Sequence, residues 1–194
     1  MRTKLSAATL LTAYRMGIFP MADPDGQIYW CSPDPRAVIE LDRFHVPRTL
    51  RQRCRQRRFT CRINTAFEQV IRGCADRSEG TWLSPEMIEG YSRLHRLGYA
   101  HSVESWQAGR LAGGLYGVTL GGAFFGESMF HRVPDASKVA LVWLVERLRQ
   151  RGFCLLDVQF LTPHLARFGA VEIPRSEYLR RLEQALARRC QFAD

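Results

Sequence analysis

Hydrophobic positions along the first 35 residues predict a helix followed by a strand. Residues 5–16 carry Leu10, Leu11 and Tyr14 on one face, which is typical of an amphipathic helix, and Gly17 and Pro20 end it. The aromatic run IYWC at 28–31 predicts a short strand.

From residue 36 onward the hydrophobic pattern alternates between strand and helix. We expect strands at 36–41 and 59–63 and helices at 47–58, 65–75 and 84–97. Three alternating runs joined by short turns that contain Gly predict an antiparallel meander at 99–106, 109–120 and 121–130. A helix from Asp135 to Gly152, a strand at 154–160, a short helix at 162–168, a strand at 170–173 and a helix from 174 complete the chain.

This order of elements predicts an α+β fold in which a mixed sheet is flanked by helices. A meander followed by helix, strand, helix and strand is the order of the acyl-CoA N-acetyltransferase superfamily, so we expect an acetyltransferase-like fold. Pro33 and Pro35 stiffen the chain and mark a domain boundary. We therefore expect a small N-terminal domain at 1–35 and a catalytic domain at 36–194.

Composition narrows the classes of protein. In 194 residues, 46% are hydrophobic and 24% are charged, which is typical of a globular chain rather than a disordered one. The six cysteines form no C-x-x-C pair and predict reduced thiols, with no metal site. No apolar run approaches the roughly 20 residues of a membrane span, so we expect a cytoplasmic protein with no membrane partner.

Basic residues concentrate in one segment of a chain whose net charge is +9. Between Arg43 and Glu68 there is no acidic residue, and every basic residue of the chain except Lys4 and Lys138 is Arg. On a helix at 47–58, one face carries the residues spaced by three and four positions, Arg48, Arg51, Arg55 and Arg58. Like charges at this spacing repel, which favours a nucleic-acid phosphate backbone as their partner over a merely solvated face.

Three polar residues interrupt the apolar strands. Asp157 and Gln159 lie two positions apart in CLLDVQF, so their side chains share one face. Glu127 follows the apolar run AFFG, on the side of Phe125 and Met129. A neighbouring strand would bring all three to one polar spot on an apolar floor, which is typical of a functional site.

Two other classes of protein account for part of this pattern. An acetyl-CoA-dependent N-acetyltransferase would share the fold, but it requires a Gly-rich pyrophosphate loop between strand and helix, and the chain has no clean match to one. A non-catalytic RNA-binding protein would explain the arginines, but it leaves the Asp/Gln pair without a purpose.

Six blocks of the sequence, in order, carry a resemblance to a known family. They are YRMGIFPM, YWCSPDPRAVIEL, GTWLSPEMIEGYSRLHRLGYAHSVESW, GGLYGVTLGGAFFGESMFHRVPDASKVAL, LLDVQF and HLARFGAVEIPRSEYL. Together they resemble the leucyl/phenylalanyl-tRNA–protein transferases from about residue 8 to 182. The resemblance implies an enzyme that takes leucine or phenylalanine from aminoacyl-tRNA and adds it to the N-terminal Arg or Lys of proteins. The added residue marks those proteins for degradation by the bacterial N-end rule.

The resemblance also implies roles for individual residues. Asp157 and Gln159 match the catalytic pair, and Glu127 matches a nearby carboxylate. The residues implied in substrate binding are Trp82 and Tyr91 for the 3′-terminal adenosine and Leu115, Phe124 and Leu144 for the transferred side chain. A related transferase that acts on N-terminal Asp or Glu is a rival, but carboxylates at the acceptor site argue against it.

The reaction implied is the attack of an amine on an activated ester. An α-amine with a pKa near 8 is partly neutral at pH 7, so modest base assistance suffices and no cofactor is expected. Our hypothesis is that Gln159 positions the amine, that Asp157 orients the Gln159 amide, and that Asp157 and Glu127 supply negative potential.

Overall fold

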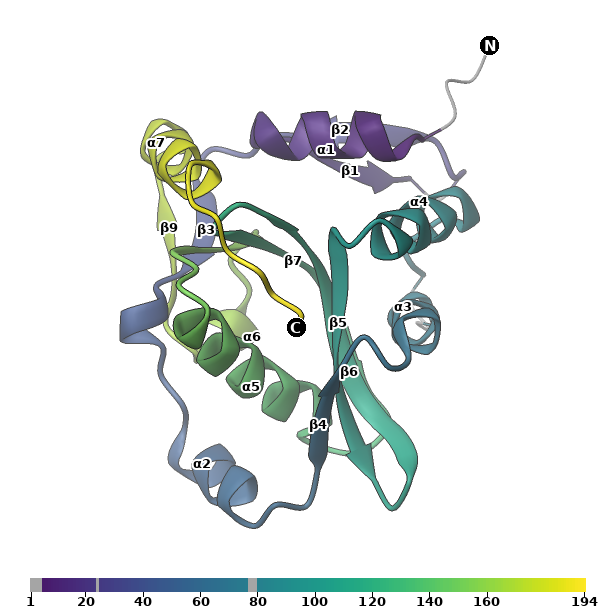
Figure 1. The fold of residues 1–194 in the computed structure, drawn as a ribbon, viewed down its shortest axis with the longest axis vertical. Coiled ribbons are helices and arrows are strands. Elements are labelled where there is room, and N and C mark those ends of the chain that lie inside the picture. The colour runs from purple at the N-terminus through teal and green to yellow at the C-terminus, as the bar shows by residue number, and fades with distance from the viewer. Residues whose placement is uncertain (1–4, 24, 77–79) are drawn as a thin grey trace.

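The computed structural model describes residues 5–23, 25–76 and 80–194, and a seven-stranded mixed sheet forms its centre (Figure 1). The strand order is β4-β5-β6-β7-β8-β3-β9, and within the described chain every neighbouring pair is antiparallel except β7 and β8. The strands are β3 (Arg36–Ile39), β4 (Thr60–Ile63), β5 (Ala100–Gln107), β6 (Arg110–Leu120), β7 (Ala123–His131), β8 (Leu155–Gln159) and β9 (Ala170–Ile173).

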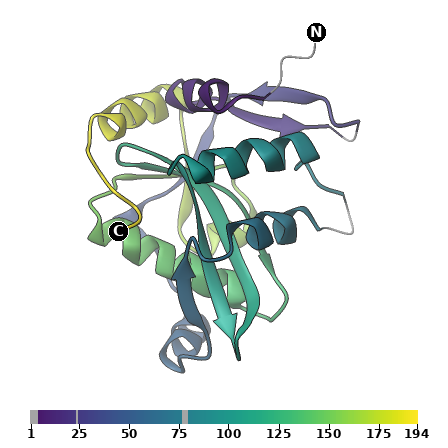
Figure 2. The ribbon, with the colours of Figure 1, turned by 45° about the vertical axis from the view of Figure 1, so that its right-hand side comes forward.

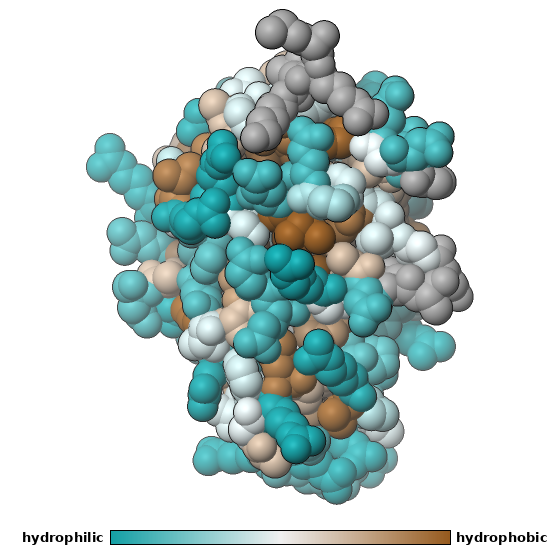
Figure 3. All heavy atoms as spheres, turned by 90° about the vertical axis from the view of Figure 1, so that its right-hand side faces the viewer, coloured by the Kyte–Doolittle hydropathy of each residue, from teal (hydrophilic) through white to brown (hydrophobic). Residues whose placement is uncertain are grey.

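Helices cover both faces of this sheet (Figures 1 and 2). On one face lie α3 (Phe67–Ala75) and α4 (Pro85–Arg96), and on the other lies α5 (Ala136–Gln150). The remaining elements of this part are η1 (Leu41–Arg43), α2 (Arg48–Arg55), α6 (Pro163–Ala166) and α7 (Arg175–Leu186). The outer side of α3 and α4 belongs to a face on which hydrophilic side chains predominate (Figure 3).

The alternation of side chains along the central strands builds two cores. On β6, Leu115 packs into the core beneath α5, while its neighbour Tyr116 packs into the core beneath α3 and α4. On β7, Phe124 and Phe125 divide in the same way. Because helices cover both faces, these strands read as nearly continuous apolar runs, and a polar residue within them requires a partner.

The N-terminal segment adds α1 (Ala7–Arg15) and a separate two-stranded sheet of β1 (Phe19–Ala22) and β2 (Ile28–Cys31). Figure 2 shows this segment across one end of the molecule. Leu10 and Tyr14 of α1 are fully buried in the same core as residues of the main sheet. The division at residue 35 stays a prediction about domains, because the two parts share a core.

The predicted elements are confirmed in their order, and the strand predicted at 36–41 is shorter, because β3 ends at Ile39 before η1. Two larger differences concern β1 and α2. The sequence did not predict β1, because Gly17 and Pro20 were interpreted as the end of a helix; Pro20 lies within the strand, whose partner is β2. The predicted helix at 47–58 is too long, since α2 ends at Arg55 and Arg57 adopts a φ of 49°. Among the described residues, no helix is long and apolar enough to cross a membrane.

Candidate active site

A β-bulge in β7 sets the direction of Glu127. In the register of β6 and β7, Gly117 faces Gly126 and Tyr116 faces Ser128, so Glu127 is the extra residue between them. A bulge interrupts the alternation of side chains. Phe125 therefore lies in the core beneath α3 and α4, while Met129 packs against the core beneath α5. The prediction that Glu127 shares one side with both Phe125 and Met129 is wrong for Met129.

A second irregularity lies on the neighbouring strand β8. Asp157 faces Val38 and Gln159 faces Ala37 on β3, so the register passes over Val158. The parallel pairing of β7 with β8 ends at Phe125 and Asp157. Both strands diverge from regular pairing where their polar residues begin. As predicted, Glu127, Asp157 and Gln159 come together at this point.

The Asp157 side chain is completely buried, and its carboxylate accepts four hydrogen bonds. Its carboxylate accepts two hydrogen bonds from Arg36, from Nε at 2.9 Å and from Nη2 at 2.7 Å. It also accepts the Tyr178 hydroxyl at 2.8 Å and the backbone N–H of Gln159 at 3.0 Å. Arg36 in turn donates from Nη1 to the carbonyl oxygen of Gly17 at 3.0 Å. A carboxylate that is paired with a guanidinium and accepts four hydrogen bonds does not attract a further cation strongly.

This arrangement corrects part of the mechanism expected from the sequence. Asp157 contacts the backbone of Gln159, and no hydrogen bond joins its carboxylate to the Gln159 amide group within the described residues. The Arg36 guanidinium also balances its charge. Asp157 therefore orients the chain at Gln159 rather than polarising the amide, and the uncompensated negative charge of the site lies on Glu127.

The Glu127 carboxylate and the hydroxyls of Tyr14 and Tyr91 form a ring of three short contacts. The Tyr14 hydroxyl donates to Oε1 at 2.7 Å, the Tyr91 hydroxyl donates to Oε2 at 2.9 Å, and the two hydroxyl oxygens are 2.8 Å apart. Two phenols carry only two protons for three contacts, so a proton on Glu127 would complete the ring. Burial raises the pKa of Glu127 to about 7, although the bonds from the two tyrosines lower it.

Gln159 has an unusual backbone at the end of β8. Its φ is 61°, in the left-handed region that non-glycine residues seldom adopt. The N–H of Gln159 is held by Asp157, and the next N–H, of Phe160, bonds to the Val158 carbonyl at 2.8 Å. The side-chain Nε2 then donates to Glu127 Oε1 at 3.4 Å. The buried ion pair thus fixes a strained backbone that presents the Gln159 amide to Glu127.

A cavity of about 370 Å³ opens beside this group, and Glu127 and Gln159 both line it. Among the residues implied by the resemblance, Leu115, Leu144 and Trp82 line it, and Met21 lines it as well. Phe124 lies behind the wall, against Phe192, and Tyr91 is buried beneath Glu127. The roles of Phe124 and Tyr91 in direct contact with substrate stay predictions.

Sequence reasoning missed three residues that build the site: Tyr14, Arg36 and Tyr178. The sequence could have indicated Arg36, because this charged residue opens the otherwise apolar strand RAVI. In the structure its side chain is 1% exposed. Tyr14 is predicted on the apolar face of a helix and Tyr178 falls in the helix predicted from 174, and nothing in helical periodicity indicates that a buried hydroxyl reaches a carboxylate from another element.

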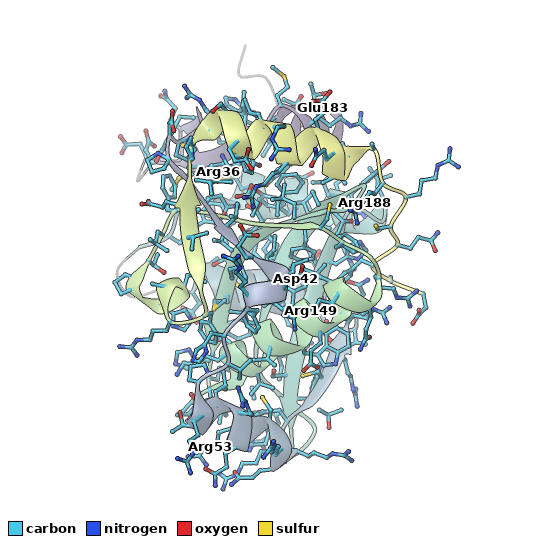
Figure 4. The ribbon with its side chains drawn as sticks, turned by 90° about the vertical axis from the view of Figure 1, so that its left-hand side faces the viewer. Arg36, Asp42, Arg53, Arg149, Glu183 and Arg188 are labelled. Carbon is cyan, nitrogen blue, oxygen red and sulfur yellow. The ribbon has the colours of Figure 1, made fainter. Side chains whose placement is uncertain are left out.

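The arginine face of α2 is smaller than predicted. Arg48, Arg51 and Arg55 lie on α2 and are exposed, while Leu50 faces the core. Arg58 is exposed but lies beyond the helix, since Gln56 closes α2 and Arg57 turns the chain away. The assignment of Arg58 to this helix face is therefore wrong. Figure 4 shows Arg53 of α2 at one end of the molecule.

All six cysteines are free, in agreement with the expected reduced thiols. Over residues 5–23, 25–76 and 80–194, no three His, Cys, Asp or Glu side chains are grouped to hold a metal ion.

Sequence comparisons now add to this geometry. A family model described as leucyl/phenylalanyl-tRNA protein transferase matches residues 38–183, and a model of the N-terminal domain of the same proteins matches residues 3–34. The chain belongs to the leucyl/phenylalanyl-tRNA protein transferase family. A family member of Gloeobacter violaceus is 61% identical over 193 residues, which are 99% of this chain and 100% of that protein.

Further comparisons agree with this family and with its fold. A leucyl/phenylalanyl-tRNA–protein transferase of Chlorobaculum tepidum is 56% identical over 187 residues, covering 94% of this chain and 96% of that protein. Among solved structures, a fungal GCN5-related glucosamine N-acetyltransferase region aligns with 73% of this chain and 20% of that chain, at a TM-score of 0.50 and 14% identity. The predicted acetyltransferase-like fold is confirmed.

Proposed function

We propose that the chain transfers leucine or phenylalanine from aminoacyl-tRNA to proteins that begin with Arg or Lys, which marks them for N-end rule degradation. The observation that carries this proposal is the contact between Gln159 and Glu127 at the wall of an apolar cavity. The cavity suits an aliphatic or aromatic side chain, and the polar pair suits a cationic amine beside it. Since aminoacyl-tRNA is the donor, we also propose a cytoplasmic location.

In the reaction, the acceptor's α-amine attacks the carbonyl carbon of the aminoacyl ester. A C–N bond forms, the bond from the carbonyl carbon to the ribose oxygen breaks, and one amine proton passes on balance to that oxygen. The Nε2 of Gln159 donates to Glu127. The Oε1 of Gln159 is therefore the atom that accepts a hydrogen bond from the amine. Ionised Glu127 takes the proton of the incoming ammonium, and positioning provides most of the acceleration.

The same carboxylate favours a basic acceptor. The N-terminus of the acceptor and its Arg or Lys side chain both carry positive charge, and Glu127 is the carboxylate of the site that lacks a cationic partner among the described residues. A side chain of Asp or Glu would place a second negative charge next to it, which costs energy in a buried site. This electrostatic argument opposes the rival specificity for N-terminal Asp or Glu.

The two other classes considered from the sequence are less favoured. The curated relatives are aminoacyl transferases over nearly the full chain, which argues against an acetyl-CoA enzyme despite the shared fold. A non-catalytic RNA-binding protein would have no use for a buried ion pair that fixes the strained backbone of Gln159.

A direct test uses radiolabelled Leu-tRNA with two proteins that differ only in their first residue, Arg or Glu. We expect label on the protein that begins with Arg. Label on the Glu protein alone would assign the rival specificity, and label on neither would refute the transfer reaction. Gln159→Ala, assayed in parallel, should reduce the rate; an unchanged rate would remove Gln159 from the mechanism.

A further inference from the structure

Four basic side chains lie near the cavity, one of which, His164, lines it, and nothing in the reaction described above uses them. They are His131 at the end of β7, Lys138 in the first turn of α5, and His164 and Arg167 in and after α6. We call these four residues the rim cluster. They come from three elements, so only the fold brings them together.

His164 connects the rim cluster to the cavity, which it lines together with Glu127 and Gln159. Burial lowers the pKa of the His164 imidazole, and the nearby Lys138, Arg167 and His131 lower it further. Its ring also packs edge-on against Phe168, with centroids 5.3 Å apart. Arg167 follows His164 by three positions at the end of α6, so the two side chains are neighbours on that helix.

Lys138 lies on the side of α5 that also carries a residue of the cavity wall. Leu141 follows Lys138 by three positions, so both lie on one face of the helix, and Leu141 lines the cavity. The Lys138 side chain is 40% exposed and donates from Nζ to Asp135 Oδ1 at 2.8 Å. Asp135 also faces Arg53 of α2, at 3.9 Å from Nε, so one carboxylate is shared by two cations.

Positive charge therefore exceeds negative charge at this edge. Arg167 is exposed, and no ion pair joins it to any part of the chain that the structure describes. A cation without an ion-pair partner, beside a lysine that shares its carboxylate with Arg53, favours the binding of an anion there. Phosphate is the anion that such side chains bind most commonly in nucleic-acid recognition.

A series of contacts also joins α2, which carries the arginine face, to Lys138 of the rim cluster. Through the Arg53–Asp135 contact, α2 adjoins the start of α5, and α5 leads by Lys138 and Leu141 to the cavity wall. Cationic side chains thus continue from the proposed tRNA-binding face to the place where the ester must react. A single strand with one phosphate per nucleotide matches this path.

We propose that the rim cluster binds the phosphodiester that joins the last two nucleotides of the aminoacyl-tRNA, with Lys138 and Arg167 as its cationic contacts. The proposal rests on the proposed function and adds a route for the 3′ end. Because the loop after Gln159 carries His164 five positions later, phosphate binding would also place the ester beside Gln159.

Three aminoacyl donors of different length distinguish phosphate binding by the rim cluster from phosphate binding elsewhere on the protein. They are leucyl-tRNA, a leucylated cytidyl-adenosine dinucleotide with one phosphodiester, and leucyl-adenosine with none. The variants are Lys138→Met with Arg167→Met, and Arg51→Ala with Arg55→Ala as the matched pair on α2, which also removes two positive charges. The rate constant kcat/KM is measured for each donor with one acceptor protein that begins with Arg.

We expect the Lys138/Arg167 variant to lose on the order of tenfold or more in kcat/KM on the dinucleotide relative to leucyl-adenosine, as for a lost hydrogen bond to a charged group. The α2 variant should lose activity on leucyl-tRNA relative to the dinucleotide. Lys138→Arg, which keeps the charge, should restore the single-site loss of Lys138→Met.

Two outcomes would overturn the proposal: an equal loss on the dinucleotide and on leucyl-adenosine, or no loss on the dinucleotide. A failure of the unmodified protein to use any of the three donors would instead refute the proposed function, so the two failures are distinguishable.

Discussion

Arg36 and Asp157 form a buried, two-pronged ion pair across 121 positions of sequence, with both side chains at most 1% exposed. The rings of Phe19 and Tyr178 flank the guanidinium, at 4.7 and 4.4 Å from its central carbon to their centroids. Arg36 thereby joins the N-terminal segment, the strand that carries Gln159 and the last helix. The reacting groups depend on this pair for their position.

Arg36→Met should destabilise the protein by about 3–5 kcal/mol, because it leaves the Asp157 carboxylate buried without a cation. Urea unfolding of the variant measures the loss. Arg36→Met combined with Asp157→Leu removes both charges and should recover much of the stability, but not the activity, since the Gln159 N–H then lacks its acceptor. A single variant that loses less than about 1 kcal/mol would contradict this account.

Transfer should depend on pH through Glu127. Its pKa is raised to about 7, so the ionised form that accepts a proton grows as pH rises through 7. With leucyl-adenosine as donor, kcat/KM should increase with an inflection near pH 7, and Glu127→Gln should remove that inflection while keeping the one due to the acceptor amine. Because the folded pKa exceeds the ordinary value of 4.5, this group's contribution to stability is lost as pH rises from about 4.5 through 7.

Tyr14→Phe should move the Glu127 inflection to higher pH. The Tyr14 hydroxyl donates to the carboxylate and so lowers its pKa; without it, burial raises the pKa further. The matched control is Tyr178→Phe, which removes a buried hydroxyl from Asp157 instead. The pH profile of kcat/KM checks both variants, and a similar shift in the control would show that the effect is not specific to Glu127.

Arg51→Ala with Arg55→Ala should weaken binding of leucyl-tRNA and reduce its dependence on salt, by a slope of roughly two for two lost phosphate contacts. The control variant, Arg188→Ala with Arg189→Ala, lowers the net charge by the same two units. Figure 4 shows Arg188 far from Arg53 of α2, so this control should keep the salt slope. An unchanged slope in the α2 variant would place the tRNA elsewhere.

Leu144→Val should shift the preference from leucine toward phenylalanine, since it removes one methylene from the cavity wall. The ratio of kcat/KM for Phe-tRNA to that for Leu-tRNA should rise roughly tenfold, the size of a one-methylene effect in an apolar pocket. Leu148→Val, a buried change one turn further along α5, should leave the ratio alone. Equal effects of the two variants would indicate a change in stability rather than specificity.

The sequence predicted most of the fold because hydrophobic period and turn residues act locally. The meander at β5 to β7, the helix α5 and the strand β8 follow from patterns within ten to twenty residues. The elements that differed, β1 and the end of α2, depend on neighbours: Pro20 is tolerated because β1 pairs with β2, and Arg57 turns the chain toward β4.

What the sequence by itself determined was the identity of the chemical groups: the Asp/Gln pair on one strand, Glu127 on another, an arginine-rich helix and the family. Which of these groups keeps its charge was decided only by the tertiary structure. Arg36, brought to Asp157 from the far side of the chain, balances the charge of that carboxylate, while burial, partly offset by the hydrogen bonds from Tyr14 and Tyr91, brings the pKa of Glu127 to about 7. Electrostatic pairing depends on distance in space, and no local pattern encodes it.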